Sequence, residues 1–178
     1  VGVTALLTAN CNVNLSDGNG LFPLYAAPSQ GAYDVLCELL DWNVKVNMVT
    51  YGGSTSLWVA ACNGQLKCVE KLLLKNADAK FQRDDLSHPL YSACEFGHIY
   101  VVRCLLDMWY FGEIMDLQGP MNKTPIMIAS ENGHANVVRS LLLKSANPNT
   151  KSSNSMTPLL AAATNGHKAV VRALLAGN

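Results

Sequence analysis

Cysteine and histidine are the side chains with the widest chemistry in this sequence, and their spacing decides what they could do. The cysteines stand at Cys11, Cys37, Cys62, Cys68, Cys94 and Cys104. No two of them form the Cys-x-x-Cys pair that is typical of zinc sites and redox motifs. The chain is rich in core residues and shows no secretion signal. We therefore interpret all six as free thiols in a reducing compartment.

Three of the four histidines each follow a glycine by one residue, at His98, His134 and His167. Their recurrence indicates a structural role, and we expect them to bond the backbone of turns. No spacing typical of a catalytic site is found: there is no carboxylate pair, Ser-His-Asp set, phosphate loop or His-Glu-x-x-His motif. We therefore expect no enzyme activity, no cofactor and no metal site.

Composition excludes several other classes of protein. The chain has 178 residues, of which 49% are apolar and 15% charged, and 13 Lys and Arg balance 13 Asp and Glu. An intrinsically disordered chain needs low hydrophobicity and high charge. A non-specific nucleic-acid binder needs excess cations, as does a basic membrane-surface domain. The longest apolar run has six residues, 57–62, so we expect no membrane insertion, and the balanced charge predicts no nucleic-acid partner.

An internal repeat organises the whole chain. Five segments align on an anchor residue, usually proline, and the anchors are Pro23, Ser56, Pro89, Pro125 and Pro158. The steps between them are 33, 33, 36 and 33 residues. An alanine stands four residues after each anchor, a glycine eight after and an aliphatic residue thirteen after, and a Leu-Leu pair follows. Five copies in register establish a repeat.

Each copy predicts two helices joined by a turn. A threonine at positions 55, 124 and 157 precedes the anchor and suits a helix N-cap, while proline suits the first helical position. The glycine ends a short first helix by adopting the left-handed conformation. We place the end of the longer second helix at Asn10, Asn43, Asn76 and Asn178. Because one helix pair cannot bury its own apolar face, the copies must stack around a continuous core.

The repeat resembles a known family. The segments Thr124-Pro125-Ile126-Met127-Ile128-Ala129 with Gly133-His134, and Thr157-Pro158-Leu159 with Gly166-His167, resemble the Thr-Pro-Leu-His…Gly-His pattern of ankyrin repeats. The resemblance implies an all-α ankyrin-repeat solenoid of stacked helix-turn-helix units with short connecting β-hairpin turns. We expect one array over 1–178, with a partial repeat at 1–16 and repeats at about 17–49, 50–82, 83–118, 119–151 and 152–178. Neither end shows a polar capping repeat, so we interpret the chain as excised from a longer array.

Some positions depart from the repeat. The 36-residue step predicts that the second helix of the third full unit runs about one turn longer, through the aromatic run 109–111. These three aromatics are either a contact site for a partner or neighbouring domain, or a wedge that packs on the next unit. Leu86 stands where the turn glycine is expected, and His88 and Phe22 replace the capping threonine. An imidazole can still cap a helix, whereas a phenyl ring cannot.

The family's consensus histidine, two residues after the anchor, is replaced in the first three units by Tyr25, Trp58 and Tyr91. In ankyrin-like arrays this position lies near the inner, concave side. The resemblance therefore implies a ladder of aromatic rings about 10 Å apart. The ladder either lines a groove with rigid anchors for a partner or packs between the inner helices.

Binding in this family generally uses the hairpin tips and the exposed face of the first helix. The partner-binding residues predicted on that surface are Tyr25, Gln30, Tyr51, Trp58, Asn63, Asp84, Asp85, Tyr91, Glu95, Phe96, Lys123, Glu131 and Asn132. Four acids make its centre negative, while many Lys and Arg fall on or near the second helices. This pattern predicts a protein or peptide partner with Lys or Arg beside an apolar anchor. A scattered, solvated surface is the alternative.

The expected function is a non-catalytic protein–protein interaction scaffold that holds its partner in the concave groove. The stacked frame fixes side chains in advance, so little ordering entropy is lost on binding. We expect a monomeric fragment in the cytoplasm, with the nucleus also allowed. One alternative is a structural spacer that packs on other domains. Another is the substrate-recognition module of a ubiquitin-ligase adaptor. A methyl-lysine reader needs aromatic rings within about 6 Å of one point, and a one-per-repeat ladder is too spread for that.

Overall fold

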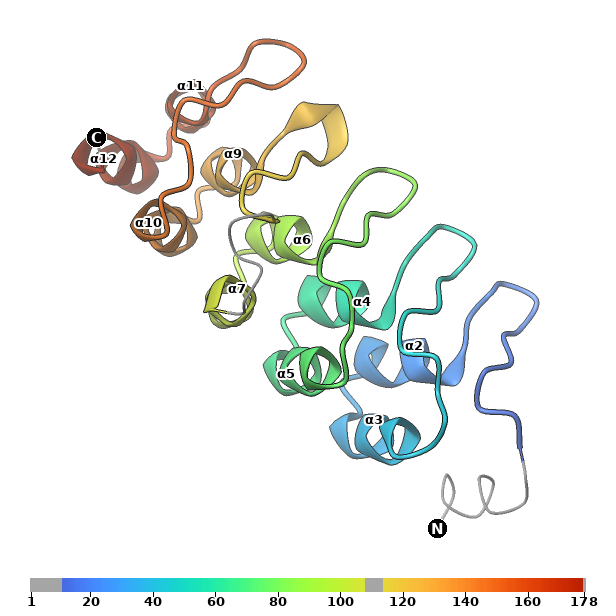
Figure 1. The fold of residues 1–178 in the computed structure, drawn as a ribbon. Helices are drawn as coiled ribbons and strands as arrows, with labels where there is room; N and C mark the ends of the chain where they lie inside the picture. Colours follow the sequence, from blue (N-terminus) through green and yellow to red (C-terminus); the bar gives the residue numbers. More distant parts are fainter. Residues whose placement is uncertain (1–10, 108–113, 178) are drawn as a thin grey trace.

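The computed structural model describes residues 11–107 and 114–177 and arranges them as a stack of helical hairpins (Figure 1). The first helices of the units form an inner row: α2 (Pro23–Ser29), α4 (Ser56–Cys62), α6 (Pro89–Glu95), α9 (Pro125–Glu131) and α11 (Pro158–Thr164). The second helices form an outer row: α3 (Tyr33–Leu40), α5 (Leu66–Leu74), α7 (Ile99–Asp107), α10 (Ala135–Leu143) and α12 (Lys168–Ala176). Consecutive helices of each row pack on one another. The predicted all-α solenoid is therefore confirmed, and each anchor residue begins one of the inner helices.

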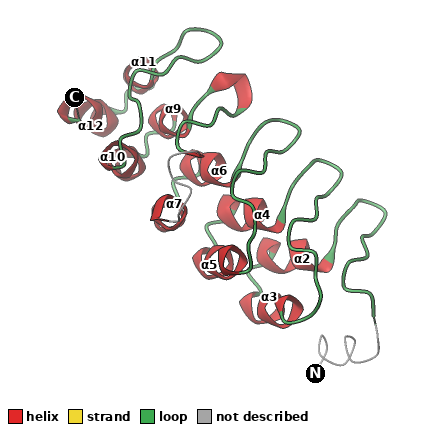
Figure 2. Cartoon of the chain, viewed as in Figure 1, coloured by secondary structure: helices red, strands yellow, loops and turns green. Residues whose placement is uncertain are grey.

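Hairpin turns connect the units and project together on one side of the stack (Figure 2). Each is closed by a backbone hydrogen bond across five residues, as between Thr50 N–H and Ser54 O at 3.0 Å. The fourth turn contains the 3₁₀ segment η1 (Pro120–Asn122). No strand occurs among the described residues. In the third turn Leu86 adopts φ +69°, the left-handed conformation in which Gly53 stands one unit earlier at +71°.

Helix capping follows the sequence prediction at most positions. The hydroxyls of Thr55 and Thr157 accept hydrogen bonds from the backbone N–H groups of the third helical residues. His88 caps α6 in the same way through Nδ1, whereas Phe22 provides no cap. The expected cap at Thr124 is wrong, because its hydroxyl instead lies 2.9 Å from the hydroxyl of Thr150.

Residues in the left-handed conformation follow all five inner helices and two of the outer helices, α5 and α10. The five turn glycines all have positive φ, between 69° and 81°, which confirms their predicted role. Asn76 also has positive φ after an outer helix, but Asn43 does not, and Ser145 adopts this conformation at the equivalent place after α10. The prediction for Asn43 is therefore wrong. The predicted ends at Asn10 and Asn178 lie outside the described residues.

The core runs without interruption along the stack, between the two rows. The repeated alanines are all nearly inaccessible, with exposures between 0% and 4%, and they lie where neighbouring inner helices pack on one another. The first leucine of each Leu-Leu pair also belongs to the core, from Leu39 to Leu174. Each unit therefore buries its apolar face against its neighbours, as expected of a repeat array.

The Gly-His histidines tie neighbouring units together. The Nε2 atoms of His98, His134 and His167 each lie 2.9 Å from a backbone carbonyl at the end of the preceding inner helix. Each ring also covers a turn glycine of that unit: a Cβ built on Gly97 would lie 2.5 Å from Nδ1 of His134. These glycines are therefore required twice, for their positive φ and for the space that the ring occupies. The predicted structural role of the histidines is confirmed.

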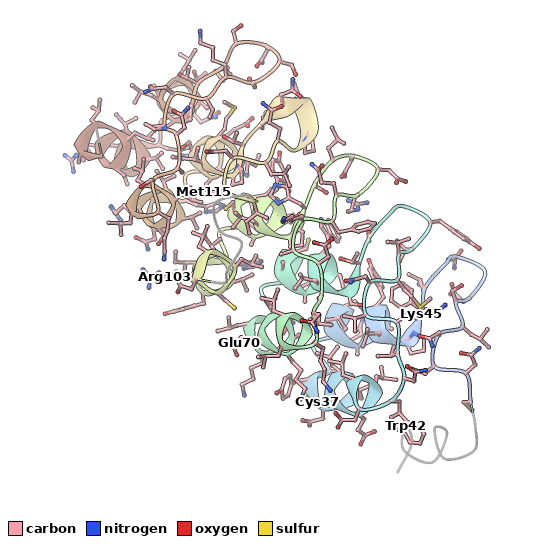
Figure 3. All side chains as sticks on the ribbon, viewed as in Figure 1. Cys37, Trp42, Lys45, Glu70, Arg103 and Met115 are labelled. Carbon is pink, nitrogen blue, oxygen red and sulfur yellow. The ribbon has the colours of Figure 1, made fainter. Side chains whose placement is uncertain are left out.

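The predicted extension of α7 and the aromatic run 109–111 lie outside the described residues. After the gap, Ile114 and Met115 are again buried in the core. Leu117 O lies 3.2 Å from Nε2 of His88, so the segment that follows the insertion returns to α6. The outer surfaces of α5 and α7 carry Glu70 and Arg103, which point away from the inner row (Figure 3).

Candidate functional site

A hollow of about 520 Å³ lies on the inner row, between α4, α6 and α9. We call it the inner hollow. Its lining residues are Trp58, Cys62, Arg83, Asp85, Ser87, Tyr91, Glu95, Phe96, Pro120, Lys123, Ile128, Glu131 and Asn132. A second, more open hollow shares Glu95, Phe96, Glu131 and Asn132 and continues to His167. Together they form a groove along the inner row from α4 toward α11.

The structure brings together eight of the thirteen residues predicted from the sequence. The inner hollow contains Trp58, Asp85, Tyr91, Glu95, Phe96, Lys123, Glu131 and Asn132. The other five do not line it. Tyr25 is half-buried on α2, where its ring centroid lies 5.8 Å from that of Phe22. The remaining four are exposed elsewhere on the surface, namely Gln30, Tyr51, Asn63 and Asp84.

The residues of the predicted aromatic ladder differ in how far they are exposed to the inner hollow. Tyr91 is only 3% exposed and packs against the backbone of Gly119, where a Cβ would lie 2.6 Å from its ring. Trp58 is half-buried, and Phe96 is 54% exposed. Tyr91 therefore forms the wall of the inner hollow, while Trp58 and Phe96 present the apolar surface that a partner could contact.

Arg83 is the main feature of the hollow that sequence reasoning missed. Its guanidinium carbon lies 4.3 Å from the centroid of the Trp58 ring, a cation–π distance. Its Nη1 donates to Oδ2 of Asp85 at 2.9 Å. The sequence did offer an indication of the ion pair, because Arg83 stands directly before Asp84 and Asp85 at the start of the hairpin that follows the Trp58 unit. Its contact with a ring 25 positions earlier depends on how the hairpin folds over α4.

Asp85 is held in its charged form. Its burial alone would raise the pKa, but the Oδ1 atom accepts hydrogen bonds from Ser87 N–H at 2.9 Å and from the Ser87 hydroxyl. These bonds and the Arg83 charge outweigh burial and leave the pKa of Asp85 below its usual value.

Glu95 differs from the other acids of the hollow. Asp85 pairs with Arg83, and Glu131 pairs with Lys123 at 2.7 Å. Across the described residues, Glu95 has no cation within ion-pair distance. Partial burial raises its pKa, and the neighbouring Asp85 and Glu131 raise it further, against the lowering effect of Lys123. Glu95 is thus the acid whose charge the protein itself leaves least compensated.

Burial, together with these negative charges, keeps the Tyr91 phenol and the Cys62 thiol protonated. Burial raises the pKa of Tyr91, and the carboxylates of Glu95, Glu131 and Asp85 add to the shift. Burial and Glu95 likewise raise the pKa of the Cys62 thiol, although Arg83 opposes them. A protonated thiol and phenol are poor nucleophiles, so this arrangement favours non-covalent binding.

Two other kinds of site do not occur in the described part of the chain. Within residues 11–107 and 114–177, no group of three or more His, Cys, Asp or Glu side chains is placed to hold a metal ion. Among the same residues, no helix combines the length and apolar character needed to cross a membrane.

Comparison with known proteins agrees with the fold. A family model described as ankyrin repeats (3 copies) matches residues 2–85, 57–152 and 109–178. An ankyrin repeat and KH domain-containing protein, mask-1 of Caenorhabditis elegans, is 32% identical over 86% of this chain. The transient receptor potential cation channel subfamily A member 1 of Drosophila melanogaster is 26% identical over 74% of it. The human SH3 and multiple ankyrin repeat domains protein 2 is 25% identical over 86% of it.

The alignments cover only 6%, 12% and 8% of these three relatives, so they bear on the repeats and not on the relatives' other parts. Ankyrin repeats are in general protein–protein interaction modules without catalytic activity. Because the family model extends over nearly the entire sequence and the stacked hairpins follow its period, this chain belongs to the ankyrin-repeat family.

Proposed function

We propose that this array is a non-catalytic scaffold that binds a segment of another polypeptide in the inner hollow. The bound segment places a basic side chain against Glu95 and an apolar side chain against Trp58 and Phe96. The observation that carries the proposal is the charge arrangement: two acids of the hollow have their own cations, and among the described residues Glu95 does not.

A partner's Lys or Arg is the group that best completes this site. Glu95 is partly buried beside two other acids, and this burial, followed by the charges of Asp85 and Glu131, raises its pKa. A cation from the partner would remove that imbalance, and the surrounding apolar surface strengthens the pair by excluding water. The site is already shaped: Arg83 and Lys123 are held by their acids, so few side chains need ordering when the partner binds.

The proposal can be tested with peptides selected on the chain from a random displayed library. We expect the selected sequences to share a basic residue next to an apolar one. Titration calorimetry with one such peptide should show about tenfold weaker binding to Glu95→Gln, since one charged contact is lost. Glu70→Gln is the matched control, because Glu70 is exposed on the outer surface of α5, and it should bind as the unmodified chain does.

Trp58→Ala tests the apolar half of the site. It should weaken the same peptide while thermal unfolding, followed by circular dichroism, shows that the array is still folded. Selection of peptides without basic residues, or unchanged affinity in both Glu95→Gln and Trp58→Ala, contradicts the proposal.

A further inference from the structure

Charge is distributed unevenly along the array although the chain is neutral overall. Residues 1–44 contain four Asp or Glu and no Lys or Arg, whereas residues 132–178 contain five Lys or Arg and no Asp or Glu. The stack therefore has an acidic first part and a basic last part. This polarity lies along the stack and is separate from the acidic inner hollow.

An apolar groove lies inside the basic part, on the outer row between α10 and α12. The two helices pack side by side (Figure 1), and the groove has a volume of about 370 Å³. Its lining includes the apolar residues Leu142, Leu143, Ala173 and Ala176, together with Arg139 and Arg172. Leu143 is 84% exposed.

The two arginines of this groove are available to a ligand. Arg139 donates to Oδ1 of Asn136 at 2.7 Å. Among the residues that the structure describes, neither arginine has a carboxylate within ion-pair distance. Lys144, by contrast, pairs with Asp107 at 2.9 Å. The groove thus combines apolar surface with two uncompensated guanidinium groups, which bind carboxylates with directional, paired hydrogen bonds.

We propose that the α10–α12 groove is a second docking surface, which takes an acidic segment of a partner protein with apolar and carboxylate side chains on the same face. Charge complementarity selects this occupant. A membrane surface is less suited, because the cations are divided between two helices and a hairpin instead of lining one amphipathic helix. A second copy of this chain could place its acidic first unit against this basic part, but such a head-to-tail contact would continue from copy to copy without forming a closed ring. Neither the membrane nor the second copy would need the apolar groove.

Fluorescence anisotropy with two labelled helical peptides tests the assignment. One carries Leu and Glu at helical i, i+3, i+4 spacing, and the other has Gln in place of every Glu. We expect the Glu peptide to bind about tenfold more tightly than the Gln peptide, with the difference shrinking as salt is raised. The double variant Arg139→Gln/Arg172→Gln should lose that difference, and Leu143→Asn should weaken both peptides.

Two controls distinguish binding in this groove from binding elsewhere on the chain. Lys151→Gln removes an exposed cation of the same basic part that does not line the groove, and it should bind as the unmodified chain does. Glu95→Gln should also leave the affinity for the Glu peptide unchanged. A failure of this proposal is therefore distinguishable from a failure of the function proposed for the inner hollow. Equal loss in Lys151→Gln and in the double variant overturns the proposal. So does Arg172-dependent binding to anionic phosphatidylserine vesicles or Arg172-dependent self-association without peptide binding.

Discussion

His88 should make the stability of the array depend on pH between the ordinary pKa of histidine and the lowered pKa of this residue. The residue is fully buried at the start of α6. Its Nδ1 accepts from Tyr91 N–H at 3.4 Å, and its other nitrogen lies 3.2 Å from Leu117 O. The neutral ring satisfies both contacts by accepting at Nδ1 and donating at Nε2. A second proton on Nδ1 would remove the cap and leave a buried charge.

The size of the effect follows from the pKa of His88. Burial lowers it from 6.5 to about 4, against the opposing effect of the Leu117 carbonyl. Between these values the unfolded chain binds more protons than the folded one, so stability rises with pH and is lost as pH falls from 6.5 toward 4. At about 1.4 kcal/mol per pKa unit, the folded state should lose about 2 kcal/mol between about pH 7 and about pH 5.

Urea unfolding of the chain and of His88→Thr at several pH values measures this difference. Threonine caps the equivalent helix through Thr55, so the variant keeps a cap and removes the titrating group. The unmodified chain should lose about 2 kcal/mol more than the variant between about pH 7 and about pH 5. Only the pH dependence matters here, because the variant also loses the bond to Leu117. Parallel pH profiles for the two proteins would refute the reasoning.

Three further predictions concern backbone conformation and thiol access. Gly166 has φ +74° and open space around the position of a Cβ, so Gly166→Ala should lower the free energy of unfolding by about 1–2 kcal/mol, as measured with urea. Gly97→Ala should lower it further, because the added Cβ would also meet the ring of His134. Equal losses in the two variants would argue against the ring contact. Leu86→Gly should raise the free energy of unfolding by up to about 1 kcal/mol, because the positive φ is then unstrained; a destabilised variant would contradict this. Exposed Cys11 should react with iodoacetamide well before Cys94, which is fully buried and has a raised pKa; peptide mass mapping at intervals detects any reversal of that order.

The fold could be predicted from the sequence because each repeat position carries one physical requirement. Alanine is small where inner helices approach, and glycine adopts positive φ at the turn. These local rules recur five times, and the recurrence distinguishes them from chance. They failed where a side chain had an alternative partner, as when the Thr124 hydroxyl contacted Thr150 and left the α9 cap unfilled.

The candidate site was predicted less completely, because it depends on contacts between units. Spacing placed Trp58, Glu95 and Phe96 on the inner row, but it could not show that Arg83 lies over the Trp58 ring. Nor could it show that Tyr91 is closed off by Gly119. Both facts follow from how a hairpin folds over the neighbouring helix, which depends on the three-dimensional packing of several residues and not on any one repeat position.

The histidine links make the junctions between the described units unequal in strength. They join three successive junctions, through His98, His134 and His167, but the corresponding position at the first junction is Gln65, which lies against Gly31. The α2–α3 hairpin also begins at an uncapped Phe22. Under a pulling force we expect the junction between the α2–α3 and α4–α5 hairpins to separate before the three junctions that carry a histidine, while the groove from Trp58 onward keeps its shape. A polypeptide held in that groove would therefore remain bound while this junction opens and re-forms.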